Sequence, residues 1–235
     1  MLEWKCLVFL AKKELLVLQS IVVFGAGGHA KTVIDVIEKQ GLYRIIGLLD
    51  SNRSAHDVVY DYNILGDESW LSLHSDAIDG AIVAIGDNWT RSCIVSKLKA
   101  FVPTLSFITA IHPSAELARG SRVGVGSVVM AGAVINSDAT VDEHCILYPH
   151  TSIDHDSRVG SFVSFAPQSV TGGNVSINDY TAIAIGATIA HGITIGEHSV
   201  IGAGATVLTN IPSHTIAYGT PARVIRPRGI GERYL

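Results

Sequence analysis

An apolar residue recurs at every sixth position through the second half of the sequence, from Ile111 to Val207. Of these seventeen positions only Thr171 is not apolar, and the slot four residues further along is usually small. A helix repeats every 3.6 residues and a flat strand every two, so neither buries this pattern. The chain is therefore expected to wind into a solenoid of six-residue faces, three to a coil. Its large side chains point inward, and its small ones fill the turns.

The first half of the chain has a different rhythm, which begins with SIVVFGAGGHAKTVIDVIEKQG. The β-branched run Ile21–Val23 predicts a buried strand, and apolar residues at helical spacing predict a helix that stops at Gly41. Further strands are predicted over RIIGLLD, ending at Asp50, and GAIVAIGD, ending at Asp87, before a helix from about 89 to 100. Alternating strands and helices indicate a small Rossmann-like parallel sheet, whose ligands bind at the carboxyl ends of the strands.

Composition limits the function classes. The chain has 235 residues, 48% hydrophobic and 16% charged, with a net charge of −4, so no basic surplus points to nucleic acid or an anionic membrane. Three widely spaced cysteines predict a reducing, cytoplasmic setting. The apolar run over 6–11 is shorter than the roughly 18 residues of a membrane span and has no signal-peptide cleavage site. We expect four parts: an N-terminal extension (1–19), the sheet domain (20–110), the solenoid (111–215) and a C-terminal tail (216–235).

The glycine motif GAGGHA follows the first strand and satisfies the loose form G-x-G-x-x-A. Together with Asp50 at the end of the second strand, it mimics a dinucleotide fingerprint. Gly25, Gly27 and Gly28 would let the backbone approach a phosphate at the helix N-terminus. The alternative is a tight turn that binds no ligand.

The stretch TSIDHDSRVG places His155 between Asp154 and Asp156. An imidazole, with an ordinary pKa of about 6.5, is suited to accept a proton near neutral pH. A neighbouring carboxylate would fix its tautomer and stabilise the imidazolium. The spacing alone equally fits a polar residue at a solenoid corner, since other histidines are scattered through the coils.

Several motifs together resemble those of a known family: FGAGGHAKTVIDVI, SIDHDSRVG, IGEHSVIGAGATV and YGTPARVI. They are similar to the hexapeptide-repeat sugar acetyltransferases that modify sialic acid or nucleotide-linked 4-amino sugars, and the likeness covers residues 20 to about 227. The resemblance implies an α/β nucleotide-sugar domain followed by a left-handed parallel β-helix. It also implies a homotrimer, with acetyl-CoA between adjacent copies. The implied reaction is acetyl transfer to a sugar amine without a covalent intermediate, with hydroxyl acetylation as the alternative.

The resemblance also assigns roles to residues. His155 matches the family's catalytic base, with Asp156 as its first candidate partner and Asp154 as its second. The implied substrate residues are Gly25, Gly27, Gly28, His29, Asp50 and Asn88, and the implied coenzyme residues are Ser164, Gly173 and Arg223. The chain departs from the family pattern at Tyr148, where an asparagine is usual, and at Ser164, where the family tends to carry a second histidine.

Two other classes compete with this interpretation. Zinc hydratases with a β-helix carry three histidines at spacings of thirty-six and then five residues. His150 and His155 are five apart, but the residue thirty-six before His150 is Ser114. His155 and His191 are thirty-six apart, but the residue five beyond His191 is Gly196. Each alignment lacks its third ligand, so we expect no metal. The other class is a non-catalytic trimer that only retains a nucleotide sugar.

Overall fold

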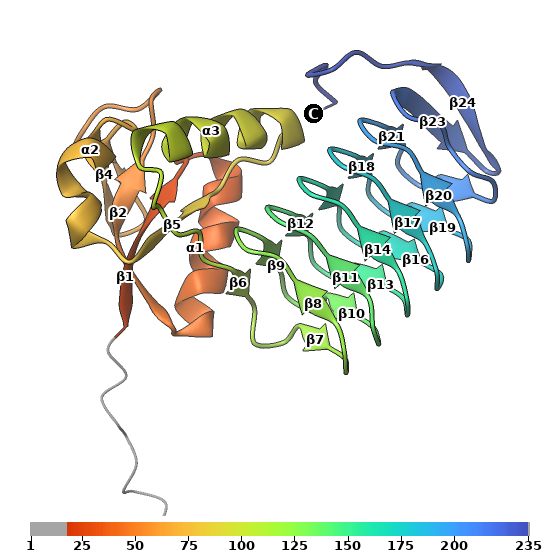
Figure 1. Cartoon of the computed structure of the whole chain (residues 1–235), viewed down its shortest axis with the longest axis horizontal. Helices are drawn as coiled ribbons and strands as arrows, with labels where there is room; N and C mark the ends of the chain where they lie inside the picture. Colours follow the sequence, from red (N-terminus) through yellow and green to blue (C-terminus); the bar gives the residue numbers. More distant parts are fainter. Residues whose placement is uncertain (1–17, 235) are drawn as a thin grey trace, which may run out of the picture.

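The computed structural model describes residues 18–234 (Figure 1), so nearly all of the predicted N-terminal extension lies outside the described residues. A small α/β domain lies at one end of the molecule, and a long solenoid extends away from it. The C-terminal tail runs back along the solenoid toward α3 of the first domain (Figure 1).

The first domain is built on one five-stranded sheet in the order β3-β4-β2-β1-β5. As predicted, its strands are parallel, except that β3 pairs antiparallel with β4. Gly41 ends the first helix in the left-handed conformation (φ 69°) that glycine adopts without strain. The elements are β1 (Gln19–Phe24), α1 (Gly28–Gln40), β2 (Tyr43–Leu49), β3 (Val58–Val59), β4 (Tyr62–Gly66), α2 (Trp70–His74), the 3-10 turn Ser75–Ala77, β5 (Gly80–Val83) and α3 (Asn88–Phe101).

The third predicted strand is shorter than expected: it ends at Val83 and not at Asp87. Its neighbour β1 ends at Phe24, whose carbonyl accepts the N–H of Ala84. Beyond Phe24, β1 offers β5 no further residue to pair with. The chain therefore leaves the sheet at Ala84. The following loop reaches the N-terminus of α3, where the Asp87 side chain accepts a hydrogen bond from the N–H of Thr90.

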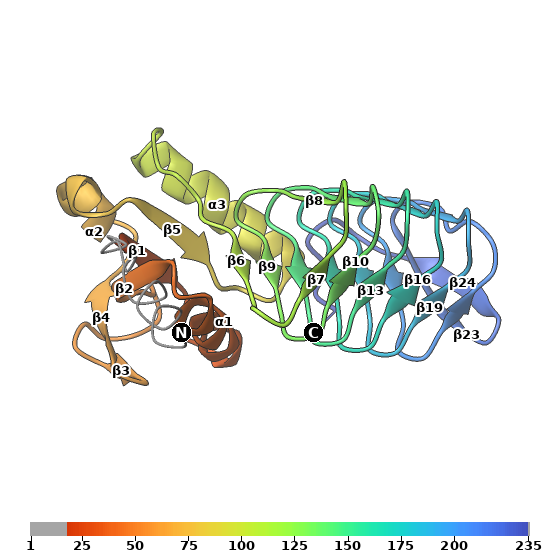
Figure 2. The same cartoon turned by 90° about the horizontal axis from the view of Figure 1, so that it is seen from below.

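The second half of the chain forms the predicted left-handed β-helix, with a two-residue strand at almost every sixth position (Figure 2). Strands eighteen residues apart pair in parallel, so each coil bonds to the next. The strands are β6 (Ala110–Ile111), β7 (Glu116–Leu117), β8 (Arg122–Val123), β9 (Val128–Val129), β10 (Val134–Ile135), β11 (Thr140–Val141), β12 (Ile146–Leu147), β13 (Ser152–Ile153), β14 (Arg158–Val159), β15 (Ser164–Phe165), β16 (Val170–Thr171), β17 (Ser176–Ile177), β18 (Ala182–Ile183), β19 (Thr188–Ile189), β20 (Thr194–Ile195), β21 (Val200–Ile201), β22 (Thr206–Val207), β23 (Thr215–Gly219) and β24 (Ala222–Pro227).

These strands form three sheets, one on each side of the prism: β7 through β22, β8 through β20, and β6 through β24. The predicted inward column is buried along most of its length, as at Ile135, Ile153 and Phe165. Burying one such apolar side chain contributes about 1.5–3 kcal/mol. Leu117 is partly exposed because it belongs to the first coil, which no earlier coil covers.

The two domains share a buried interface. Helix α1 lies against the outer face of the third solenoid sheet, where its Val33 and Ile37 belong to the same apolar cluster as Val128 and Ile146. This cluster holds the carboxyl ends of the first domain's strands at a fixed place beside the coils.

Arg91 of α3 also joins the two domains. Its guanidinium is buried and donates to the carbonyls of His144 and Phe162 in the solenoid. It also donates to the carbonyls of Ile85 and Gly86 in the loop after β5. One side chain therefore fixes that loop against two coils.

Candidate active site

His155 lies at an exposed solenoid corner, in the turn between β13 and β14. Its ring Nδ1 is 2.8 Å from Oδ2 of Asp156, and this hydrogen bond raises the pKa of His155 above its ordinary 6.5. Asp156 has a left-handed backbone (φ 57°), a conformation that aspartate tolerates better than most residues. The other ring nitrogen, Nε2, does not take part in this pair.

Asp154 contacts the backbone of the turn. Its Oδ1 accepts the N–H of His155 at 2.8 Å and the side-chain amide of Asn136, one coil earlier, also at 2.8 Å. The bond from the His155 N–H is the main reason that the pKa of Asp154 falls below its ordinary value. Of the two predicted carboxylates, Asp156 therefore touches the ring, and Asp154 holds the peptide that carries it.

Gly173 lies on the next coil, directly beside this imidazole. A Cβ at Gly173 would lie 2.5 Å from both Cε1 and Nε2 of His155, so the ring occupies the space that a side chain would fill. One coil further on, the ring of His191 is centred 6.2 Å from that of His155. We call residues 154–156 with Gly173 the His155 corner.

The predicted phosphate turn lies at the start of α1. Gly25 has φ 113°, and a Cβ there would come within 2.8 Å of the Ala84 carbonyl, so only glycine fits. Cβ atoms built on Gly27 and Gly28 would meet nothing within 4 Å, and no side chain caps the helix. Asp50 braces the turn by accepting the N–H of Ala26 at 2.8 Å. The free N–H groups of this helix end can receive an anion.

His29, in the first turn of α1, faces the solenoid. Its Nδ1 is 3.2 Å from the hydroxyl of Tyr148, and its Nε2 is buried without a hydrogen-bond partner in the described structure. Burial, with a smaller effect of the Arg91 charge, lowers the pKa of His29 to about 4, so the ring is neutral at neutral pH. Tyr148, one of the departures from the family pattern, thus joins a predicted substrate residue to the solenoid.

Asn88 begins α3 and is fully buried. Its amide donates to the Thr181 carbonyl at 3.1 Å, and its side-chain oxygen accepts from Arg91 at 2.7 Å. Its side chain is therefore engaged in the domain interface, and a direct contact with substrate stays a prediction.

Ser164 lines a mostly apolar cavity of about 310 Å³ between the domains, together with Gly86 and Tyr148. Its Oγ lies 3.2 Å from the hydroxyl of Tyr234, which also accepts the N–H of Asn88 at 3.3 Å. We call this space the junction cavity. Tyr234 comes from the tail, where no periodic pattern or motif singles it out, so sequence reasoning missed it.

The predicted site residues thus fall into separate groups. His29 bonds to Tyr148, which lines the junction cavity with Ser164, whereas none of the cavity-lining residues belongs to the His155 corner. Arg223 lies in neither group: it is exposed on β24, where its guanidinium donates to the neighbouring Ala222 carbonyl.

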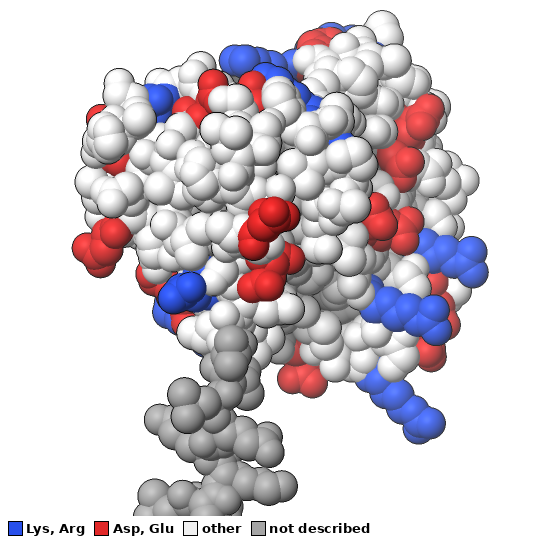
Figure 3. All heavy atoms as spheres, turned by 60° about the vertical axis from the view of Figure 1, so that its left-hand side comes forward, with Lys and Arg blue, Asp and Glu red and all other residues white. Residues whose placement is uncertain are grey.

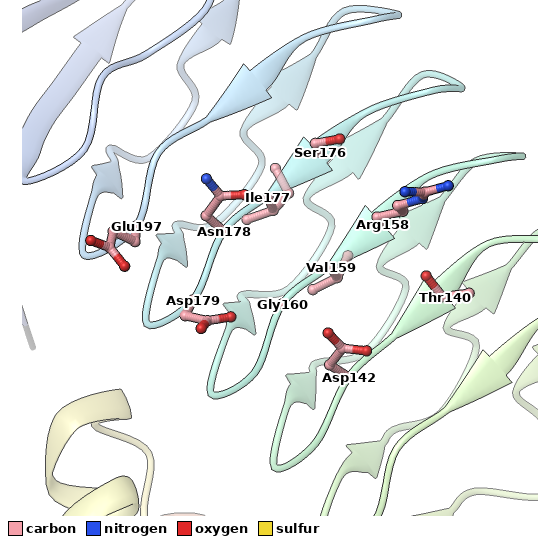
Figure 4. Close-up of a pocket in the computed structure, with 10 residues that line it drawn as sticks. All are labelled: Thr140, Asp142, Arg158, Val159, Gly160, Ser176, Ile177, Asn178, Asp179 and Glu197. Atoms are coloured by element: carbon pink, nitrogen blue, oxygen red, sulfur yellow. The ribbon is translucent and has the colours of Figure 1, made fainter.

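A second hollow, of about 540 Å³, lies on the outer face of the sheet that contains β14 (Figure 4). Asp142, Asp179 and Glu197 line one edge of it, and Arg158 extends from the strand face. On the molecular face drawn in Figure 3, basic side chains are interspersed with acidic ones. Within residues 18–234, no three His, Cys, Asp or Glu side chains gather as metal ligands. None of the helices described is long and apolar enough to cross a bilayer.

Comparison with known proteins agrees with the sequence motifs. Residues 20–98 match the PglD N-terminal domain family, and residues 174–209 match the bacterial transferase hexapeptide family of six repeats. The UDP-N-acetylbacillosamine N-acetyltransferase of Bacillus subtilis (strain 168) is 29% identical over 123 residues, 48% of this chain. The match spans only 52% of that curated relative.

Solved structures match over greater lengths. PerB from Caulobacter crescentus, solved with CoA and GDP-perosamine, is 32% identical with a TM-score of 0.82, over 88% of this chain and 97% of that one. The acetyltransferase domain of PglB from Neisseria gonorrhoeae FA1090, solved with acetyl coenzyme A, is 28% identical with a TM-score of 0.81, over 88% and 100%. The chain therefore belongs to the family of hexapeptide-repeat acetyltransferases that carry a PglD-type N-terminal domain.

Proposed function

We propose that this protein transfers the acetyl group of acetyl-CoA to the amino group of a nucleotide-linked amino sugar, with His155 as general base. The observation that carries the proposal is the 2.8 Å pair between His155 Nδ1 and Asp156 at an exposed corner of an acetyltransferase fold. A relative that binds both CoA and GDP-perosamine supports the choice of substrates.

The pair has the polarity that the reaction needs. Asp156 accepts Nδ1–H, which leaves Nε2 as the basic nitrogen. The sugar amine attacks the thioester carbonyl, Nε2 takes the amine proton, and the new C–N bond replaces the C–S bond as CoA leaves. The imidazolium then gives this proton to the CoA sulfur, which leaves as the free thiol. Asp156 stabilises the imidazolium that exists between these two transfers.

The glycine turn supports the nucleotide part of the proposal. The uncapped N-terminus of α1 and the open space over Gly27 and Gly28 suit the phosphates of a nucleotide sugar. The neutral ring of His29, whose buried Nε2 lacks a protein partner in the described structure, is suited to contact the sugar.

The separation of the two groups supports a homotrimer. Helix α1, which begins at the glycine turn, packs against the sheet of β6 through β24, whereas the His155 turn joins the other two sheets. One chain therefore does not bring its glycine turn and its imidazole together. We therefore assign the completed site to adjacent copies, with acetyl-CoA between them. Ser164, Gly173 and Arg223 stay the proposed coenzyme residues.

The test is turnover of acetyl-CoA with GDP-perosamine and with UDP-linked amino sugars, followed by release of free thiol. His155→Ala should lower kcat by about 10²- to 10⁴-fold, the usual contribution of a general base. His191→Ala is the matched control, because His191 occupies the same corner two coils away and has no carboxylate partner in the described part of the chain. This control should keep wild-type turnover.

Light scattering would establish that both variants keep the oligomeric state of the parent protein. Near-normal turnover of the His155→Ala trimer would remove the general-base assignment. Tight binding of GDP-perosamine without thiol release by the parent protein would favour the non-catalytic scaffold.

A further inference from the structure

Thr171 is the single polar residue in the inward column of the solenoid. It is buried, between the apolar Ile153 and Ile189 of the adjacent coils. A hydroxyl in such a column costs stability unless it forms a hydrogen bond. Its partner therefore indicates what the hydroxyl contributes.

That partner is the backbone of Asp154, one coil earlier. In the neighbouring coils, the N–H that follows each strand of this sheet bonds to a carbonyl of the next coil, as from Asn136 to Ile153 (2.9 Å) and from Gly172 to Ile189 (2.8 Å). The Asp154 N–H instead donates to Oγ1 of Thr171 at 3.1 Å.

The coil pairing changes at the same point. Strands β13 and β16 share one residue pair, between Ser152 and Val170, whereas β10–β13 and β16–β19 each share two. The regular backbone ladder is thus opened beside Asp154, and a side-chain oxygen replaces the missing carbonyl acceptor.

Asp154 is also the residue that holds the catalytic turn. Its backbone rests on Thr171, while its carboxylate accepts the N–H of His155 at 2.8 Å. A hydrogen-bonded path therefore runs from the Thr171 hydroxyl to the backbone N–H of Asp154, and from the Asp154 carboxylate to the backbone N–H of His155.

Folding alone does not require this hydroxyl. Valine has nearly the same shape as threonine, would complete the apolar column, and would allow the Asp154 N–H to form the ladder bond found in the other coils. The polar residue therefore maintains a local distortion that the rest of the repeat avoids.

We propose that Thr171 is a positioning residue for His155, which holds the turn displaced from the regular ladder so that the imidazole meets the acceptor amine. This inference rests on the proposed function, because it requires His155 to be the general base. Thr171 acts through Asp154 and does not touch substrate.

Thr171→Val is the direct test, with acetyl-CoA and GDP-perosamine as substrates. We expect kcat to fall by about 10- to 100-fold, the cost of displacing a catalytic group by a fraction of an ångström to about 1 Å. The KM values should be unchanged, and the thermal unfolding temperature should be equal or higher. Thr171→Ser keeps the hydroxyl and should restore most of kcat.

Two further variants keep the inference falsifiable. Thr171→Ala also lacks the hydroxyl and has a smaller side chain, so it provides the same kcat test if the valine variant does not assemble. In a His155→Ala background, Thr171→Val should cause no further loss, since both changes act through one imidazole.

Each outcome separates the two hypotheses. Normal kcat in Thr171→Val and Thr171→Ala, with His155→Ala inactive, overturns the positioning role and leaves the proposed function standing. An equal loss from Thr171→Val with or without His155 shows that Thr171 acts elsewhere and also overturns it. An active His155→Ala protein overturns the proposed function itself, and the inference with it.

Discussion

Replacing His144 with phenylalanine should make the protein less sensitive to acid. The His144 ring is buried, stacks on Phe162 with centroids 5.1 Å apart, and meets Phe107 edge-on at 4.7 Å. Its Nδ1 has no hydrogen-bond partner in the described structure. Burial, followed by the charges of Arg91 and Lys99, lowers the pKa of His144 from 6.5 to about 4. Phenylalanine keeps the aromatic stack and removes the titrating group.

The magnitude follows from proton linkage. The unfolded chain exposes this histidine with a pKa of about 6.5 and binds a proton between that pH and about 4, where the folded chain does not. The unfolded state is therefore favoured as the pH falls through this window. For one such site, the free energy of unfolding at pH 5 is lower than at pH 8 by about 2 kcal/mol. His29 shifts in the same direction, so the variant keeps part of the acid sensitivity.

Denaturant unfolding at pH 8 and pH 5, at one protein concentration, measures this difference. From pH 8 to pH 5, the free energy of unfolding should fall by about 2 kcal/mol less in His144→Phe than in the parent protein. His150→Phe is the matched control, because His150 occupies an equivalent left-handed turn position but is exposed. It should lose as much stability as the parent. The reasoning fails if His144→Phe loses the same free energy as the parent between pH 8 and pH 5.

Two predictions concern the His155 corner. Asp156→Asn keeps an acceptor for Nδ1 but removes the charge, so the pKa of His155 should fall. Because the base acts only when neutral, the acid limb of the pH profile of kcat/KM should move to lower pH, and the maximal rate should drop; an unmoved limb contradicts the pairing. Gly173→Ala should displace the ring, which lies 2.5 Å from the added carbon. Turnover should then fall with little change in the unfolding temperature, and normal turnover would show that the ring does not need this space.

The solenoid was predictable because each coil repeats the same requirement. Every sixth residue must fill the interior, and the structure places a strand at almost all of these positions. The first domain was predictable where one strong signal decides an element, as Gly41 does for the end of α1. The third strand was predicted too long, since its end depends on where its neighbour stops at Phe24. The strands of the β3–β4 hairpin are only two and five residues long, which is too short to show a period.

The site was predictable in part. Family resemblance singled out His155 and ranked Asp156 before Asp154, but the contacts of each carboxylate depend on the backbone of the turn. Asn88 follows the expected strand and loop, yet the fold uses its side chain to join two domains. Tyr234 reaches the junction cavity only because the tail folds back, and no local pattern encodes such a long-range contact.

Exceptions to the repeat carry information that the repeat itself does not. A stacked coil is stabilised when each residue obeys the common pattern, so an exception costs free energy unless a contact compensates it. Thr171 breaks the apolar column, and the pairing between β13 and β16 loses one residue pair. Gly173 leaves space for the His155 ring, but this is not an exception, because Gly126 and Gly132 do the same for the rings of His144 and His150. The polar residue and the lost pairing both lie beside the turn of His155, which among the described residues is the histidine paired to a carboxylate at 2.8 Å. Unrelated departures from the repeat would have no reason to lie together. Residues that position one imidazole, by contrast, must lie beside that imidazole.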